Sequence, residues 1–224
     1  MSSSAAKLTR EQIVRTALRL LDEVGLEGLT LRRIATELGV QAPALYWHVK
    51  NKEQLLDELA SAVLDDAAEQ VDFDSPHRDW RTELWEAARF LRGLMLAHRD
   101  GAKLVSGTFY TGKTFMSTPD KRILPILRAA GFGTEDATDL IMAMYHYTIG
   151  FVIEEQEVFP TPGHRDPRYA MEKLLARAKR DPASVERQFS GDSLEHQFHS
   201  GIRFLLDGAA ARIAENPLPP EAKA

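Results

Sequence analysis

The sequence has no cysteine and no long apolar run. Without thiols the chain cannot form disulfides, use a thiolate as a nucleophile or bind zinc through cysteine. No apolar stretch approaches the ~18 residues that a membrane-spanning helix needs. The first residues also lack the apolar segment of a secretory signal peptide. We therefore expect a cytoplasmic protein without a membrane partner.

Motifs of catalysis are missing as well. The sequence has no phosphate-binding loop, no nucleophile elbow and no Cys-His pair. His196 and His199 lie three residues apart, and His146 precedes Glu154 by two helical turns. Neither spacing gives a metal site with three protein ligands. We expect neither an enzyme nor a bound metal or cofactor.

Charge is distributed unevenly along the chain. The 224 residues include 28 Lys and Arg against 33 Asp and Glu, for a net charge of −5. Residues 1–52 contain eight basic and five acidic side chains, a balance of +3, so the remaining residues carry −8. A basic segment attached to an acidic body is typical of a DNA-binding module joined to a regulatory body.

Capping residues and glycines divide the basic segment into short helices. Thr9 and Gln12 form a capping box that opens the first helix, and Gly25 ends it. Thr30 can cap a second helix, which Gly39 ends by supplying a left-handed residue. Two helices joined at a glycine turn are typical of a helix-turn-helix, here spanning residues 30–49.

The third helix would be the one that enters the major groove of DNA. Pro43 suits an early helical position, and we expect about two turns, through Trp47. Asn51 then caps a fourth helix, over residues 52–70, with Gln54 as its reciprocal partner.

The helical spacing of the third helix places Leu45 and Val49 inward. The outward side chains would make a poor solvent face and suit contact with thymine methyls, sugars and phosphates. They are Ala42, Pro43, Ala44, Tyr46, Trp47 and His48.

The remainder shows no sustained alternation of period two, so we predict an all-α protein. Residues 1–52 form a three-helix helix-turn-helix DNA-binding domain, and residues 53–224 form a larger helical domain for ligand binding and dimerisation. We expect a loop at 159–164. The helices expected in the larger domain cover residues 77–97, 102–112, 120–130, 135–156, 168–179 and 194–214.

Apolar stripes on the helices expected at 135–156 and 194–214 are candidates for a dimer interface, although either stripe could belong to the core of one chain. One short recognition helix covers little DNA, whereas a dimer reaches two half-sites about 34–36 Å apart. We therefore expect a homodimer. The stripe residues are Leu140, Ala143, Met144, Tyr147 and Phe151, followed by Leu194, Phe198, Ile202, Leu205, Ala209 and Ile213.

The N-terminal segments 25–30, 34–35 and 38–40 resemble the DNA-binding domain of the TetR family. The run Leu-Tyr-Trp-His-Val-Lys-Asn-Lys at 45–52 is similar to that of the tetracycline repressors within it. Residues 99–103 and 146–150 are similar to their regulatory domain. The resemblance implies a ligand-responsive repressor that binds a near-palindromic, double-stranded DNA operator and is released by a small-molecule effector. It also implies dimerisation through a four-helix bundle.

The resemblance assigns roles to the DNA-binding side chains. Arg32 would contact a guanine edge, and Pro43 and Tyr46 would pack on thymine methyls and backbone. Ala42 and Ala44 replace a glutamine and a threonine of the tetracycline repressors that take part in base recognition, which implies a different operator. The complete DNA-binding set is Thr30, Leu31, Arg32, Gln41, Ala42, Pro43, Ala44, Tyr46, Trp47, His48 and Lys52, with Thr30, Trp47, His48 and Lys52 on phosphates.

The effector site departs further from the tetracycline repressors. His146 matches a pocket histidine, and Glu154 matches a carboxylate that faces the metal's water shell from the other subunit. Val105 stands where their metal-binding histidine would be, and Ala87 and Ala68 replace an asparagine and a second histidine that hold the drug. Valine offers no lone pair to a hard cation. Tetracycline with magnesium is therefore disfavoured as the effector.

The replacements favour a hydrophobic or aromatic effector, with one or two hydrogen bonds to His146 or Thr108. Any single one of these side chains could equally be ordinary core. A helical protein–protein adaptor, which would show no salt-sensitive binding to DNA, is the alternative function. The candidate effector residues are Ala87, Leu91, Met95, Val105, Thr108, Phe109, Phe115, Met142, Tyr145, His146 and Glu154.

Overall fold

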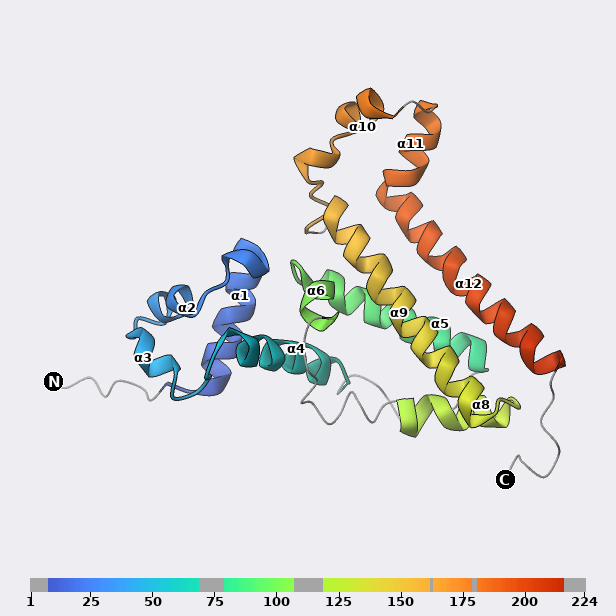
Figure 1. Cartoon of the computed structure of the whole chain (residues 1–224), viewed down its shortest axis with the longest axis horizontal. Helices are drawn as coiled ribbons and strands as arrows, with labels where there is room; N and C mark the ends of the chain where they lie inside the picture. The colour runs from blue at the N-terminus through green and yellow to red at the C-terminus, as the bar shows by residue number, and fades with distance from the viewer. Residues whose placement is uncertain (1–7, 69–78, 107–118, 162, 179–180, 216–224) are drawn as a thin grey trace.

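A computed structural model describes residues 8–68, 79–106, 119–161, 163–178 and 181–215. Across these ranges the chain forms helices and turns without any strand, as the sequence predicts. Figure 1 shows two parts, a head at the N-terminal end and a larger body. None of the described helices has the length and apolar character needed to cross a membrane.

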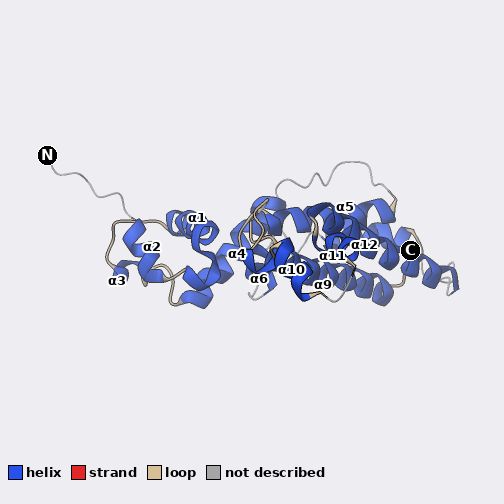
Figure 2. Cartoon of the chain, turned by 90° about the horizontal axis from the view of Figure 1, so that it is seen from above, coloured by secondary structure: helices blue, strands red, loops and turns tan. Residues whose placement is uncertain are grey.

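The first four helices of the described chain form the head and connect it to the body. Their bounds are α1 (Arg10–Gly28), α2 (Leu31–Glu37), α3 (Ala42–Leu45) and α4 (Lys52–Ala68). We call α1 to α3 and the first half of α4 the head, and the rest of the described chain the body. Figure 2 shows α4 lying between these two parts.

The predicted caps of the first two helices are present. The Thr9 hydroxyl accepts a hydrogen bond from the Gln12 amide at 3.2 Å, and the Gln12 side chain accepts one from the Thr9 amide at 2.9 Å. Thr30 caps α2 by accepting from the Arg33 amide at 3.2 Å. Gly39 has φ +66°, the left-handed conformation expected after the end of α2.

Three local details differ from the prediction. Gly25 is left-handed, with φ +70°, but helical structure resumes after it and continues to Gly28. The helix α3 ends at Leu45 rather than Trp47, so it has one turn. Gln54 donates its amide to Asn51 as predicted, at 2.8 Å, but its side chain reaches the Lys50 amide, at 2.7 Å, one residue before the predicted partner.

The body is built around the long helix α9. This helix packs against α5, α6, α8 and α12, and Figure 1 shows α12 running beside it. The elements of the body are α5 (Trp80–Leu96), α6 (Gly101–Ser106), a π-helical turn η1 (Pro119–Ile123), α8 (Leu124–Ala129), α9 (Thr134–Val158), a 3-10 turn η2 (Pro167–Tyr169), α10 (Met171–Arg177), α11 (Pro182–Phe189) and α12 (Gly191–Glu215).

The bounds of α9 and α12 agree with the sequence-based ones within three residues at each end. The helix expected at 102–112 ends at Ser106 in the described chain, and its remainder lies outside the described residues. The helix α11 was not predicted. Its signal is Asp181 followed by Pro182, because the Asp181 side chain caps the helix by accepting from the Ser184 amide at 3.1 Å.

Buried apolar side chains form three clusters. The head cluster includes Ile13, Leu45 and Leu59, and it also takes in Leu104 of α6. A second cluster joins α5, α8, α9 and α12. A third, which we call the central cluster, joins Leu64 of α4 to α5, α6 and α9. The helix α4 therefore contributes to both the head and the body.

Candidate DNA-binding and effector sites

The DNA-binding face rests on two buried anchors. Leu45 and Val49 are fully buried in the head cluster, as predicted. Their burial turns the residues between them outward, so that Tyr46 is 55% exposed and Trp47 is 89% exposed. Pro43 is exposed in the preceding turn of α3. An indole with so much apolar surface in water is unusual for a residue that serves only the fold.

The turn between α2 and α3 holds this face in position. The Gly39 amide donates to Thr36 O at 3.1 Å, and the Val40 amide donates to Ala35 O at 3.0 Å. A side chain at Gly39 would meet nothing within 4 Å, so the requirement for glycine comes from its positive φ and not from space. Gln41 is exposed at the start of α3, where it makes no capping bond through its side chain.

The other predicted DNA contacts are exposed or half-buried. Arg32 and Thr30 are exposed at the start of α2, and Leu31, Ala42, Ala44 and His48 are half-buried. Lys52 is half-buried, and its ammonium donates to Leu26 O at 2.7 Å. An ammonium has three donors, so this bond leaves capacity for a phosphate. The predicted DNA-binding residues thus lie from the cap of α2, through the turn and α3, to the first residue of α4.

Part of the predicted effector set comes together in the central cluster. Leu91 and Met95 of α5 and Val105 of α6 are buried there, and Tyr145 of α9 packs against them. Burial raises the pKa of Tyr145, which keeps its hydroxyl in the neutral, hydrogen-bonding form. Ala87 packs instead against the second cluster, on the same helix as Leu91.

The three described candidates that remain, all on α9, do not belong to this cluster. Met142 is 43% exposed, and His146 and Glu154 are exposed on the same side of α9. Thr108, Phe109 and Phe115, together with the side chain of Ala68, lie outside the described residues. Within one chain, the described part of the effector site is therefore apolar.

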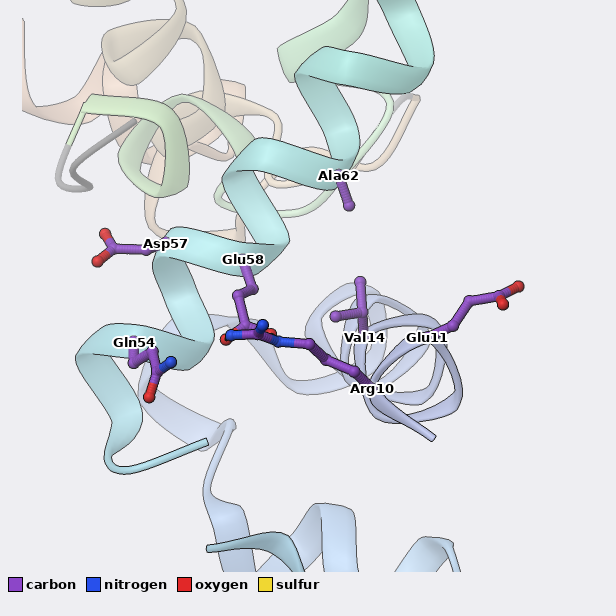
Figure 3. Close-up of a pocket in the computed structure, with 7 residues that line it drawn as sticks. All are labelled: Arg10, Glu11, Val14, Gln54, Asp57, Glu58 and Ala62. Carbon is purple, nitrogen blue, oxygen red and sulfur yellow. Dashed lines mark hydrogen bonds and ion pairs between the residues drawn. The ribbon is translucent and has the colours of Figure 1, made fainter. Parts of the chain in front are cut away.

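A separate groove of about 490 Å³ lies in the head, between α1 and α4 (Figure 3). Across it the Arg10 guanidinium pairs with the Glu58 carboxylate. None of the predicted effector residues lines this groove. It is lined by Arg10, Glu11, Val14, Gln54, Asp57, Glu58 and Ala62.

Sequence reasoning missed the polar groups inside the body. Arg92 and Glu155 form a largely buried ion pair, with N···O distances of 2.8 and 2.6 Å. Arg122 and Glu83 form another, with two distances of 3.0 Å. A signal was available, because Glu155 falls three residues after buried Val152 and so continues an apolar register.

Sequence reasoning also missed the contact between the head and the body. We call this contact the head–body joint. It consists of residues 22–26 of α1 and residues 98–100, which lie between α5 and α6. Asp22 accepts from the Arg99 amide at 3.1 Å, and its two carboxylate oxygens lie 3.1 and 3.2 Å from His98 Nδ1. In return, Asp100 accepts from the Leu26 amide at 2.8 Å. Each part thus provides a carboxylate to a backbone amide of the other.

Gly25 permits the close approach at this joint. A Cβ there would lie 2.6 Å from the Asp100 carboxylate and 3.1 Å from Nε of Arg99, in addition to the strain of its positive φ. The Arg99 guanidinium also donates to Glu23 O at 3.1 Å. The two parts are therefore held by directional bonds to backbone as well as by apolar packing.

Comparison with known proteins finds two family models along the chain. Residues 13–59 match the model described as "Bacterial regulatory proteins, tetR family". Residues 74–213 match "Tetracyclin repressor-like, C-terminal domain". The first match contains the helix-turn-helix, and the second spans the body from α5 to α12.

Individual proteins agree with these models. The chain is 40% identical to the tetracycline repressor protein class A from transposon 1721 of Escherichia coli, over 92% of each chain. A TetR variant from Acinetobacter baumannii AYE, solved in complex with minocycline, superposes with a TM-score of 0.68, at 30% identity over 95% of this chain and all of that one. BioQ, solved with its natural double-stranded DNA operator, gives a TM-score of 0.65 at 30% identity, over 91% of this chain and 99% of the other.

Proposed function

Because this chain belongs to the TetR family of bacterial transcriptional regulators, we propose that it is a repressor that binds a near-palindromic operator as a homodimer and leaves it when a small hydrophobic effector binds. As a member of the family it is a DNA-binding regulator of transcription. The observation that carries the proposal is the exposed pair Tyr46 and Trp47, held outward by buried Leu45 and Val49. A solved relative in complex with its operator supports it.

Operator binding is tested by footprinting the purified protein on the promoter regions that flank its own gene. We expect a protected site whose affinity falls by a factor on the order of 10³ between about 50 and 200 mM salt, because basic side chains release counterions from several phosphates. An adaptor protein would protect no site at either salt concentration. That result would reject the proposed function.

A homodimer follows from the two half-sites that such an operator presents. The predicted stripe residues Leu140, Met144 and Phe198 are buried within the chain, so they build the subunit's own core. We propose that the opposite sides of α9 and α12 form the dimer contact. Phe204 of α12 is 76% exposed there, and Ala143 of α9 is exposed as well.

The apolar lining of the central cluster supports a hydrophobic effector. Val105 is buried beside Met95 and Leu91, and none of these side chains can coordinate a hard cation. We therefore infer an effector other than tetracycline with magnesium, although several relatives are named tetracycline repressors.

Thermal unfolding tests this choice of effector. Tetracycline with magnesium should leave the unfolding temperature unchanged, and a screen of hydrophobic and aromatic compounds should find some that raise it, since a ligand that binds only the folded state stabilises it. Compounds that raise it should also release the operator. A large shift with tetracycline and magnesium would reverse our interpretation of Val105.

A further inference from the structure

A single amide side chain on α9 contacts both helices that flank the head–body joint. Gln156 is 6% exposed. Its Oε1 accepts from the Ala102 amide at 3.0 Å, and its Nε2 donates to His98 O at 2.7 Å and Met95 O at 3.2 Å. A glutamine amide has two N–H donors, so both donors are used. Its position relative to α5 and α6 is therefore fixed by three bonds.

These partners lie where two helices end and begin. The helix α5 ends at Leu96, and α6 starts at Gly101, so Met95 O and the Ala102 amide are at helix ends, where backbone groups lack part of their intrahelical bonding. A side chain at Gly101 would overlap the Met95 carbonyl. The turn between the two helices is thus tightly closed, and Gln156 ties it to α9.

The same turn holds the head. The His98 carbonyl accepts a hydrogen bond from Gln156, and the His98 ring lies beside the Asp22 carboxylate. Asp100 accepts from the Leu26 amide. A continuous series of hydrogen bonds therefore runs from α9 through the turn to α1. If α9 shifts relative to the turn, the bonds of Gln156 and those to the head cannot both keep their geometry.

Candidate effector-binding residues lie at the body end of this series of hydrogen bonds. The side chain of Met95 is in the central cluster while its carbonyl is bound by Gln156. Val105 follows Ala102 by one turn of α6, and Val152 precedes Gln156 by one turn of α9. A ligand that separates the side chains of this cluster would displace the groups that Gln156 holds.

We propose that Gln156 is a positioning residue that fixes the α5–α6 turn on α9 and thereby sets the position of the DNA-binding head. The importance of this role for regulation rests on the proposed repressor function. The hydrogen-bonded connection between α9 and the head does not rest on it. A purely structural glutamine would stabilise the body without affecting α1, and this difference can be measured.

The test compares two variants of the full-length protein. Gln156→Met keeps the length of the side chain and removes its polar atoms. Thr148→Val is the matched control, because Thr148 is a buried polar residue of the same helix whose hydroxyl, among the described residues, bonds to Met144 O in its own helix. For each variant we would measure hydrogen exchange of residues 22–28, the free energy of unfolding and the operator affinity.

In Gln156→Met we expect exchange of residues 22–28, including the Leu26 amide, to become at least about fivefold faster, and operator affinity to fall roughly tenfold, both within the range of typical coupling between sites. Thr148→Val should change neither, whatever it does to global stability. Unchanged exchange at 22–28 in folded Gln156→Met, or equal acceleration in Thr148→Val, would overturn the proposal.

A second variant covers the case in which Gln156→Met does not fold. Gln156→Glu keeps an oxygen that can accept from the Ala102 amide and removes the amide that donates to Met95 and His98. It should accelerate exchange at residues 22–28 in the same direction, and no acceleration would overturn the proposal. If the wild-type protein binds no operator, the proposed function fails, while the exchange data still decide the role of Gln156.

Discussion

At the scale of the residue, Arg32 is the side chain that we expect to contribute most to recognition of the operator bases. It is exposed on the first turn of α2, beside the cap Thr30, so its guanidinium can leave the protein surface without breaking the fold. Ala42 and Ala44 have no polar atoms in their side chains. We therefore expect Arg32 to have a larger share of base recognition here than it would have beside a more polar third helix.

We predict that Arg32→Ala weakens operator binding by about 1–3 kcal/mol and relaxes the preference at one base pair, as expected for loss of a contact to guanine. Competition titrations with operator variants would measure both effects. Arg15→Ala is the control, because Arg15 is an exposed arginine of α1 that pairs with Glu11, and it should leave the affinity unchanged. Equal loss on random DNA would assign Arg32 to phosphate contact instead.

His199 provides a pH-dependent contribution to stability. Its ring lies 4.8 Å from that of Trp85, and its buried Nε2 atom has no hydrogen-bond partner among the described residues. Burial lowers the pKa of His199, against the opposing effect of Glu195. The unfolded chain therefore takes up this proton more readily than the folded chain. The associated stability is present above the unfolded pKa of about 6.5 and is lost as pH falls below it.

We therefore predict that His199→Phe, which keeps an aromatic ring beside Trp85, reduces the loss of unfolding free energy between neutral and mildly acidic pH. Urea unfolding at several pH values would measure it. His196→Phe replaces an exposed histidine of the same helix and should retain the wild-type pH dependence. If both variants keep that dependence, the titrating group lies elsewhere.

At the scale of the element, the contact between α9 and α12 depends on the absence of one side chain. Gly201 of α12 lies against Tyr147 of α9, and an added Cβ would overlap the tyrosine ring and hydroxyl. The hydroxyl also donates to the carbonyls of Gln197 and Phe198, at 3.3 Å each, which restricts the movement of the ring. This glycine allows the two long helices to approach.

Gly201→Ala should therefore destabilise the protein by about 1–3 kcal/mol, the usual cost of overpacking. Gly93→Ala is the matched control, because a Cβ at Gly93 in α5 meets nothing within 4 Å, so it should instead stabilise by up to about 1 kcal/mol through helix propensity. Denaturant unfolding of the two variants would measure these changes. Stabilisation by both would mean that the tyrosine ring moves aside without cost.

The helices could be predicted from the sequence wherever their ends are set locally. Thr9, Thr30 and Gly39 act on backbone within a few residues, so their pattern is visible in the sequence. The roles of Glu155 and Gln156 depend on Arg92 and on the α5–α6 turn, which are more than fifty residues away. The helical register could indicate that Glu155 is buried, but nothing in the local sequence indicates such distant partners.

At the scale of the whole molecule, the sequence predicted a DNA-binding part and a regulatory part joined by the fourth helix, but not the hydrogen bonds between them. The predicted DNA-binding residues occupy a short continuous segment with a characteristic turn, which is visible in the sequence. The candidate effector residues come from several helices, and packing separates exposed His146 from buried Leu91 and Met95. Membership of a site made from distant segments is decided by the fold and not by residue type.

The dimer is also a property of the whole molecule. Phe204→Glu should raise the dissociation constant of the dimer by roughly thirtyfold, equivalent to about 2 kcal/mol, because it places a charge in the proposed contact. Sedimentation equilibrium would measure the change. Phe90→Glu is the control, because Phe90 is an exposed phenylalanine of α5 and should leave the dimer intact. A dimer unaffected by Phe204→Glu would place the contact on another surface.

Leu104 belongs to α6, yet it is buried in the cluster that forms the core of the head. A fragment cut after α4 would contain every helix of the head and still leave a hole where this leucine should be, at a cost of a few kcal/mol. The head alone, without α6, is consequently poorly suited to fusion with another protein. Chimeras that join it to a foreign body should behave well only when the donor's α6, or a side chain of equal volume at that point, is transferred with it.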